Sequence, residues 1–319
     1  MSKAILKKSL KRLLIAAASL LALIVLFFVI VYTVDVVSSK SEAKKIESYG
    51  QLVPVDGKQM NVLIEGNGDD TIVLIPGFGT AAPALDFKPL IEQLSPTNKV
   101  VVVEPFGYGL SDETDKERTT ENIASEIHEA LQQLHINRYT LMGHSIAGIY
   151  SLQYVNQYPD EIKAFVGIDT SVPNQVGSDD EIPIESIGTL KKMGIFRLVN
   201  KLQGDIYVGL PFDEKTKEQM GYISNKNLNN DTTLNEMKHF NDNFEAAKQQ
   251  VFPKQLPLLI FVQKNNTEQL DWIALHEEQI KQSDRGKLVL LDGDHYLHHT
   301  LSKEIAEGYK QFMQDQNIK

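Results

Sequence analysis

Short runs of apolar residues recur along the chain from residue 71 onward, and stretches with apolar residues at helical spacing lie between them. Residues 120–134 and 302–313 are two such stretches. Continuous apolar runs of this length are typical of strands that are buried on both faces of a sheet. The alternation therefore predicts an α/β fold, a mostly parallel sheet flanked by helices. The predicted strands are residues 71–75, 99–103, 139–142, 164–168, 256–262 and 287–291.

Two segments depart from this alternation. Residues 51–64 form a predicted hairpin, because the dipeptide Asp56-Gly57 between apolar runs favours a tight turn. Between about residues 171 and 255 no strand of the same kind occurs, although residues 187–202 and 234–251 show helical spacing. A structureless loop of that length is rare inside a compact domain. We therefore predict one domain over residues 51–319, with a helical cap inserted at about residues 171–255.

The N-terminal part of the chain has a different pattern, because residues 13–34 contain no charged side chain. At about 1.5 Å per residue, a helix over this stretch is roughly 33 Å long, which is enough to cross a hydrocarbon core of ~30 Å. A buried core helix is seldom apolar on every face at a chain terminus. The pattern predicts a transmembrane helix over 13–34, preceded by a basic cytoplasmic segment over 1–12 and followed by a polar linker over 35–50.

The charges on either side of this helix predict its orientation. Five basic residues and no acidic residue precede it, whereas both signs follow it. An excess of positive charge keeps the N-terminus cytoplasmic, so we expect a single-pass protein of the cell membrane whose remaining residues are extracytoplasmic. The alternative is a cleaved signal peptide, with Val37 and Ser39 at the cleavage site. Its apolar region would be only ~7–15 residues long, which favours the uncleaved anchor.

Composition excludes several classes of chemistry. The chain has no cysteine, so it has no disulfide framework, thiolate nucleophile or cysteine-ligated metal. Of its 32 basic and 42 acidic residues, 27 basic and all of the acidic ones follow residue 34, which gives that part a net charge of −15. Such a body repels the phosphates of nucleic acids, and we expect no nucleic-acid partner.

The most specific motif is Gly143-His144-Ser145-Ile146-Ala147-Gly148, which follows a predicted strand and opens a predicted helix. A nucleophile elbow requires this context, because its serine sits on a sharp turn where only small residues fit two positions before and after. Gly143 and Ala147 meet this requirement, although the strict pattern has glycine at the second position. The alternative is an ordinary tight turn with a structural serine. The motif predicts that Ser145 is a nucleophile, which in turn requires a histidine nearby to remove its proton.

Here the sequence resembles the α/β-hydrolase family, from about residue 51 to the C-terminus. A second matching segment is Ile75-Pro76-Gly77-Phe78-Gly79, where the family usually has a histidine at the position of Pro76. The resemblance implies that the backbone amides of Phe78 and Ile146 form the oxyanion hole. A third segment, Glu104 to Asp112, resembles the glycine-rich loop of the family that ends in Ser-Asp.

The resemblance also implies which histidine acts as the base. His295 follows the last predicted strand and precedes the final helix, where the family places this residue. His298 is the alternative. Because His299 also lies close by, the triplet invites a metal site, but no partner set with recognised metal spacing accompanies it in the sequence. We expect no metal and no cofactor.

The acid of the triad is the least determined residue. The family most often places an aspartate shortly after the strand at 256–262, but this sequence has Gln263 to Glu268 there without one. Some members place the acid after the strand that precedes the cap, and Asp169 occupies that position. Asp169 is therefore the predicted acid and Glu268 the alternative; Asp169 could equally be a residue that caps a turn.

These assignments predict a serine hydrolase that cleaves an ester-like or amide-like bond through an acyl-enzyme. An esterase or lipase asks least of the site, and a peptidase, a carbon–carbon hydrolase or an acyltransferase would use the same residues. The expected partner is a small-molecule or lipid-like substrate, and the sequence leaves the oligomeric state open. A non-catalytic surface binding protein on the same fold is the alternative of a different class.

Overall fold

The structure is a computed structural model that describes residues 3–177 and 182–318, with side chains described from residue 7 onward. The first two residues of the basic segment and residues 178–181 of the predicted cap therefore lie outside the described residues. The described residues form one eight-stranded sheet in the order β1-β2-β4-β3-β5-β6-β7-β8. β1 and β2 are antiparallel to their neighbours, and all other neighbouring strands are parallel. The strands are β1 Gln51–Val55, β2 Lys58–Glu65, β3 Thr71–Ile75, β4 Lys99–Glu104, β5 Tyr139–His144, β6 Ile162–Ile168, β7 Leu258–Gln263 and β8 Gly286–Leu291.

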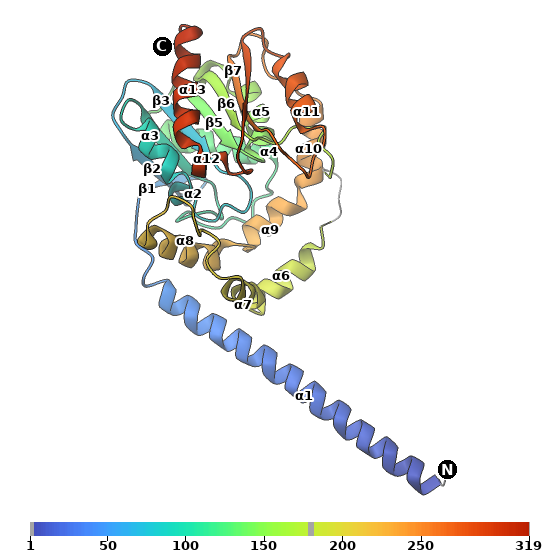
Figure 1. The fold of residues 1–319 in the computed structure, drawn as a ribbon. Helices are drawn as coiled ribbons and strands as arrows, with labels where there is room; N and C mark the ends of the chain where they lie inside the picture. Colours follow the sequence, from blue (N-terminus) through green and yellow to red (C-terminus); the bar gives the residue numbers. More distant parts are fainter. Residues whose placement is uncertain (1–2, 178–181, 319) are drawn as a thin grey trace.

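Helices cover both faces of this sheet (Figure 1). Each face buries its own apolar cluster, so the strands between them are apolar on both sides. On one face lie α4 Thr120–Gln133, α5 Ala147–Gln157 and α11 Trp272–Ile280. On the other face lie α2 Pro83–Asp86, α3 Lys88–Leu94, α12 Leu297–Thr300 and α13 Ser302–Asp315, and the short helix η1 Pro159–Glu161 joins α5 to β6.

The structure confirms the predicted α/β fold, its hairpin and its six strands, five of which are largely buried; β8, at the edge of the sheet, has no buried residue and corrects the prediction there. β3 matches its predicted range, and the other strands differ from theirs by one or two residues at an end. Both predicted sheet-flanking helices are also present, as α4 and α13. The agreement is close because a strand buried on both faces has to be apolar at successive positions. In β3 all five residues are buried.

Between β6 and β7 the described residues contain five helices and no strand, and we call this segment the cap. Its helices are α6 Ile184–Lys192, α7 Ile195–Gln203, α8 Glu214–Asn227, α9 Asp231–Lys238 and α10 Phe240–Lys248. Two continuous predicted helices are each split here. Gly194 separates α6 from α7 in a left-handed conformation with φ of 76°, and His239 separates α9 from α10. The apolar pattern also failed to predict α8. The first turn of this helix is capped by the Asp213 carboxylate, and the helix has no regular apolar spacing that the sequence analysis could detect.

Buried polar side chains hold the cap on the glycine-rich loop after β4, which explains why this part of the sequence is rich in asparagine. Asn227 and Asn230 each donate a side-chain hydrogen bond of 2.8 Å to the backbone, at Gly109 and Gly107 respectively. A Cβ on Gly107 would lie 2.9 Å from the Thr232 side chain, so the loop approaches the cap closely only because it has glycine there. The third family segment thus positions the cap.

The long N-terminal helix α1 Lys3–Glu42 extends beyond the predicted span. The predicted linker was wrong in its first eight residues, because residues 35–42 continue the helix. The reason is tertiary: Arg197 of α7 bonds to the carboxylates of Asp35 and Glu42, both at 2.6 Å, and these bonds hold the last turns of α1 against the cap. Figure 1 shows α1 leaving the body at the cap. Residues 7–42 are long and apolar enough to cross a membrane and are mostly exposed, as an anchor or a signal sequence would be.

Candidate active site

Ser145 occupies the sharp turn between β5 and α5. Its φ is 55°, a left-handed conformation that a non-glycine residue seldom adopts. A Cβ on Gly143 would lie 2.9 Å from the Cβ of Ala147, and a Cβ on Gly77 would lie 3.0 Å from the Cβ of Ser145. Small residues are therefore required at these positions, as the elbow motif predicts. The turn leaves Ser145 half-buried at the carboxyl edge of the sheet.

His295 lies in the loop after β8 and is hydrogen-bonded to Asp169, which directly follows β6. The distance from His295 Nδ1 to Asp169 Oδ2 is 2.6 Å. Because an ionised carboxylate only accepts, Nδ1 carries the proton and Nε2 is left as a proton acceptor. The His295 side chain is 42% exposed and that of Asp169 is fully buried. The pair thus has a buried acid behind an accessible base.

The second oxygen of Asp169 is held by two further donors. Its Oδ1 accepts from the indole Nε1 of Trp272 at 2.7 Å and from the backbone amide of Gln263 at 2.9 Å. Neither donor was predicted, since a tryptophan in a helix 103 residues away gives no local signal. These bonds fix the orientation of the carboxylate, so that Oδ2 faces His295.

Ser145 and Asp169 lie at the same edge of the sheet because β5 and β6 are parallel neighbours. The backbone amide of Ser145 donates to the carbonyl of Ile168, and the carbonyl of Ser145 accepts from the amide of Ser171 at 2.8 Å. The loop of His295 approaches the same turn, since the His144 and His295 ring centroids are 4.7 Å apart. The structure therefore pairs His295 with Asp169 and places the pair near the turn that carries Ser145, and within the described residues no hydrogen bond joins Ser145 to His295.

Glu268, the alternative acid, lies elsewhere. It is exposed in the loop between β7 and α11, and its backbone amide donates to the Asn266 side chain. Within the described residues its carboxylate has no hydrogen bond or ion pair. The end of β7 contributes to the site through the backbone amide of Gln263 instead of through a carboxylate.

The two amides expected to form the oxyanion hole lie on either side of the turn. Phe78 follows β3, the parallel neighbour of β5, and its ring packs edge-on against Phe240 of the cap with centroids 4.8 Å apart. Ile146 directly precedes α5 and is buried. In the part of the chain that the structure describes, neither backbone amide donates a hydrogen bond. Both donors are therefore available to a bound oxygen.

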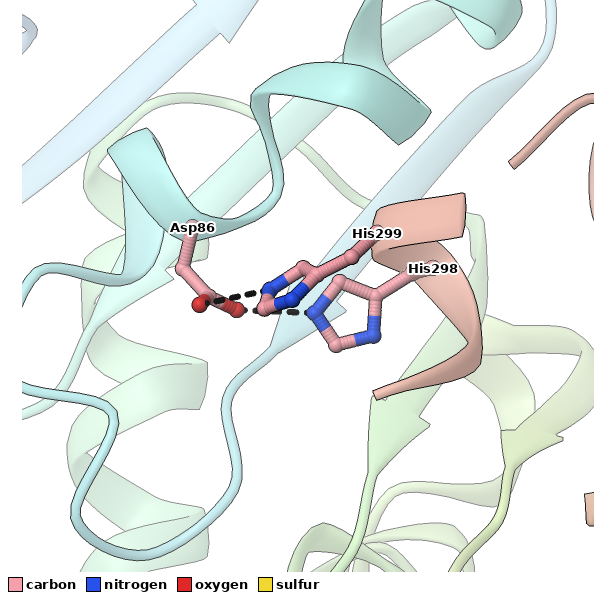
Figure 2. Close-up of side chains that lie close together, drawn as sticks. All are labelled: Asp86, His298 and His299. Atoms are coloured by element: carbon pink, nitrogen blue, oxygen red, sulfur yellow. Dashed lines mark hydrogen bonds and ion pairs between the residues drawn. The ribbon is translucent and has the colours of Figure 1, made fainter. Parts of the chain in front are cut away.

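His298 and His299 form a buried cluster with Asp86 of α2 (Figure 2). The Nε2 atoms of His298 and His299 lie 2.7 and 2.9 Å from the two carboxylate oxygens of Asp86. The Nε2 atom of His298 is therefore engaged by Asp86, and the structure brings only His295 of this triplet to Asp169. The sequence showed no carboxylate partner for these histidines because Asp86 is 212 residues away from His298.

Among the described residues, the side chains of Asp86, His298 and His299 form the group that could hold a metal ion, because their ligand atoms lie within 4.8 Å of one another. Hydrogen bonds to the histidines lower the pKa of Asp86 despite its burial, and burial lowers the pKa of His298. A carboxylate that accepts hydrogen bonds from two imidazole N–H groups agrees with both directions. The bonds join α12 to α2 and so fix the loop that carries His295.

His144 is a buried residue that supports the base. Its Nε2 lies 3.1 Å from the backbone carbonyl of His295 and, because a carbonyl only accepts, carries the proton. Burial lowers the pKa of His144 well below its usual 6.5, and the nearby His298 and His295 lower it further. His144 is thus a neutral spacer between the elbow and the histidine loop.

This environment predicts a loss of stability in mild acid. The unfolded chain takes up a proton at His144 below about pH 6.5, whereas the folded chain does so only at lower pH, so the stability contributed at neutral pH is lost as the pH falls. For one such histidine the loss is up to ~1.4 kcal/mol per pH unit, or about 2 kcal/mol between pH 6.5 and 5. Denaturant unfolding of wild type and His144→Gln measures it: the variant should lose less stability over this interval. Equal losses would contradict the assignment.

Comparison with known proteins places the chain in a family. A family model described as the alpha/beta hydrolase fold matches residues 70–193. The uncharacterized protein YbdG of Bacillus subtilis is 31% identical over 227 residues, which are 69% of this chain and 70% of that protein. The serine hydrolase BPHL of Homo sapiens is 30% identical over 118 residues, or 36% of this chain and 40% of that protein.

Solved structures agree with this placement. Cfl2 from Burkholderia cenocepacia has a TM-score of 0.66 at 14% identity and covers 82% of this chain and 94% of its own. The epoxide hydrolase VrEH1 from Vigna radiata has a TM-score of 0.63 at 18% identity and covers 83% and 97%. At these identities the likeness shows the fold. Together with the sequence matches it establishes that the chain belongs to the α/β-hydrolase superfamily.

Proposed function

We propose that this protein is a serine hydrolase that cleaves a carboxylic ester through an acyl-enzyme. The observation that carries the proposal is the hydrogen bond of 2.6 Å between His295 and the buried Asp169, beside a serine on a strained turn. The serine hydrolase BPHL, one of the relatives, is named for the same chemistry. Ser145 is the nucleophile, His295 the general base and Asp169 the acid.

The reaction follows from the proton acceptor at His295 Nε2. As Ser145 Oγ attacks the carbonyl carbon, its proton passes to Nε2, and the imidazolium is stabilised by Asp169. The proton then goes to the leaving alkoxide as the C–O bond breaks. Water attacks the acyl-enzyme, gives its proton to Nε2, and the proton returns to Ser145 Oγ as the acid leaves.

The negative oxygen of each tetrahedral intermediate is stabilised by the amides of Phe78 and Ile146. Each donor in a site of this kind contributes about 3–4 kcal/mol to the transition state. The amide of Ile146 also lies at the N-terminus of α5, where the helix dipole favours negative charge. An ester asks least of this arrangement because an alkoxide is a better leaving group than the nitrogen of an amide.

Labelling by a fluorophosphonate probe, followed by turnover of esters of graded chain length, tests the proposal. We expect covalent labelling of one serine and measurable ester turnover. Absence of both would favour the non-catalytic binding protein, and labelling without ester turnover would favour a peptidase or an acyltransferase at the same residues.

We also propose that α1 anchors the protein in the cell membrane, with the catalytic domain on the extracytoplasmic side. The support is the mostly exposed apolar helix and the basic residues that precede its charge-free stretch over residues 13–34. In a bacterial host stripped of its wall, external protease should degrade the body of the full-length protein. Complete protection in intact cells, with digestion after lysis, would reverse the orientation.

A further inference from the structure

A cavity of about 1130 Å³ lies between α1, the cap and the loop after β3. It exceeds the ~300–1,000 Å³ that is usual for small-molecule sites. The wall formed by α1 has Ser38 and Glu42 at its end near the cap, and the rest of it consists of four apolar side chains, Phe27, Ile30, Val31 and Val34. These four belong to the stretch that is free of charge over residues 13–34, and they cover about 10 Å of helix length.

The inner end of this cavity reaches the neighbours of the catalytic groups. Gly79, which lines it, directly follows Phe78 and its oxyanion-hole amide, and Tyr296, which also lines it, directly follows His295. The cavity therefore extends from the apolar surface of α1 to Gly79 and Tyr296, which are the sequence neighbours of Phe78 and His295.

The cap carries an exposed apolar patch beside α1. Val199, Leu202, Ile206 and Val208 are 39%, 77%, 68% and 75% exposed. They lie on α7 and the loop that follows it, and α7 contacts α1. Exposed apolar side chains that cluster in this way mark an interaction surface, and next to a membrane helix the apolar phase at hand is the bilayer interface.

The position of α7 along α1 places this patch at the end of the apolar stretch. Arg197 bonds to Asp35, the first charged residue after that stretch, and to Glu42. Val31, four residues before Asp35, is only 9% exposed, although its neighbours on α1 are open. The cap thus begins to cover α1 within its last apolar turn, which leaves no spacer between the membrane and the body.

We propose that the cavity is a lateral entrance through which the acyl chain of a membrane lipid ester passes from the outer leaflet to Ser145, with the α7 patch seated in the interface. This rests on the proposed serine hydrolase function. The cavity suits an amphiphile, because its α1 wall is apolar over residues 27–34, while α8 lines the cavity with Glu214, Lys217 and Glu218. The acyl chain follows α1, and the polar head group stays beside the charged side chains of α8.

Gly221 of α8 allows the cavity to be filled without a clash. It lines the cavity, and a Cβ built on it meets no atom within 4 Å. In full-length protein reconstituted into phosphatidylglycerol and phosphatidylethanolamine vesicles, Gly221→Trp should lower kcat/KM for p-nitrophenyl palmitate by about tenfold or more and leave p-nitrophenyl butyrate turnover unchanged. Gly221→Ala, which removes the same helical glycine but leaves the cavity open, should behave like wild type on both esters.

A second pair of variants tests the patch. Leu202→Glu combined with Val208→Glu, neither of which lines the cavity, should lower palmitate turnover in vesicles by about tenfold and leave butyrate turnover unchanged, because charge disfavours seating in the interface. Val251→Glu is the control, since Val251 is 60% exposed in the loop between α10 and β7, away from α1.

The outcomes separate the two proposals. If wild type hydrolyses neither ester and no serine is labelled, the serine hydrolase function fails. If wild type hydrolyses butyrate but Gly221→Trp changes neither ester, or changes both equally, the hydrolase remains and the lipid entrance is wrong. Palmitate losses in Val251→Glu equal to those of the patch variant would also overturn it.

Discussion

Replacing Ser145 by alanine should abolish covalent labelling by a fluorophosphonate and lower ester turnover by ~10⁴ to 10⁶. The expected loss is large because this turn offers no other nucleophile for acyl transfer. The oxyanion-hole amides and His295 remain, and they support only a small residual rate. The fold should persist, since alanine is smaller than serine and the strain of the turn lies in its backbone. Initial rates on a short-chain ester and the labelled fraction measure the effect.

The matched control is Ser171→Ala. Ser171 is 7% exposed at the same edge of the sheet, and its amide, which the substitution keeps, donates to the carbonyl of Ser145. This variant should be labelled and should turn over like wild type. Near-normal turnover by Ser145→Ala, or equal losses in both variants, would remove Ser145 from the mechanism.

Asp169→Asn should lower kcat by about 10⁴, as the loss of the acid does in serine triads, with little change in the fold. The geometry gives the reason. Since Oδ1 accepts from Trp272 and Gln263, the amide oxygen of an asparagine will take that place and its NH₂ group will face His295 Nδ1. Nδ1 must then accept, which moves the imidazole proton to Nε2 and leaves no base for Ser145.

Glu268→Gln is the comparison for this variant, because it makes the same chemical change in the exposed loop after β7. We expect wild-type turnover. A pH–rate profile distinguishes the roles further. The maximal rate of Asp169→Asn, at the pH where it is most active, should be lower than the maximal rate of wild type. An active Asp169→Asn enzyme together with an inactive Glu268→Gln enzyme would move the acid to Glu268.

The sequence predicted those parts of the molecule whose signal is local. The buried strands require successive apolar residues, and the elbow requires small residues around Ser145, so both patterns are visible within a few positions. His295 was predictable only through its order in the chain relative to the strands. The acid stayed open between Asp169 and Glu268, because the choice depends on which loop the fold brings to His295, and no local pattern carries that information.

The missed features depend on contacts between distant segments. Trp272 supports Asp169 across 103 residues, and Asp86 meets His298 across 212. The helix α8 was missed because it has a cap residue and few apolar positions, and the helical continuation to Glu42 because its charges looked like those of a linker. In the structure those charges are the partners of Arg197.

The bonds from Arg197 to Asp35 and Glu42 join α1 and the cap into one rigid unit. A helix that spans a bilayer tilts when the hydrocarbon thickness differs from its own apolar length, and such tilts reach tens of degrees. Because Asp35 and Glu42 are tied to α7, the body has to follow that tilt instead of staying upright on a flexible stalk. If α1 spans the membrane as proposed, the whole body therefore leans toward the membrane surface in a thinner bilayer. The lipid composition of the membrane would then set the angle between the catalytic domain and the membrane surface, even when no lipid occupies the cavity.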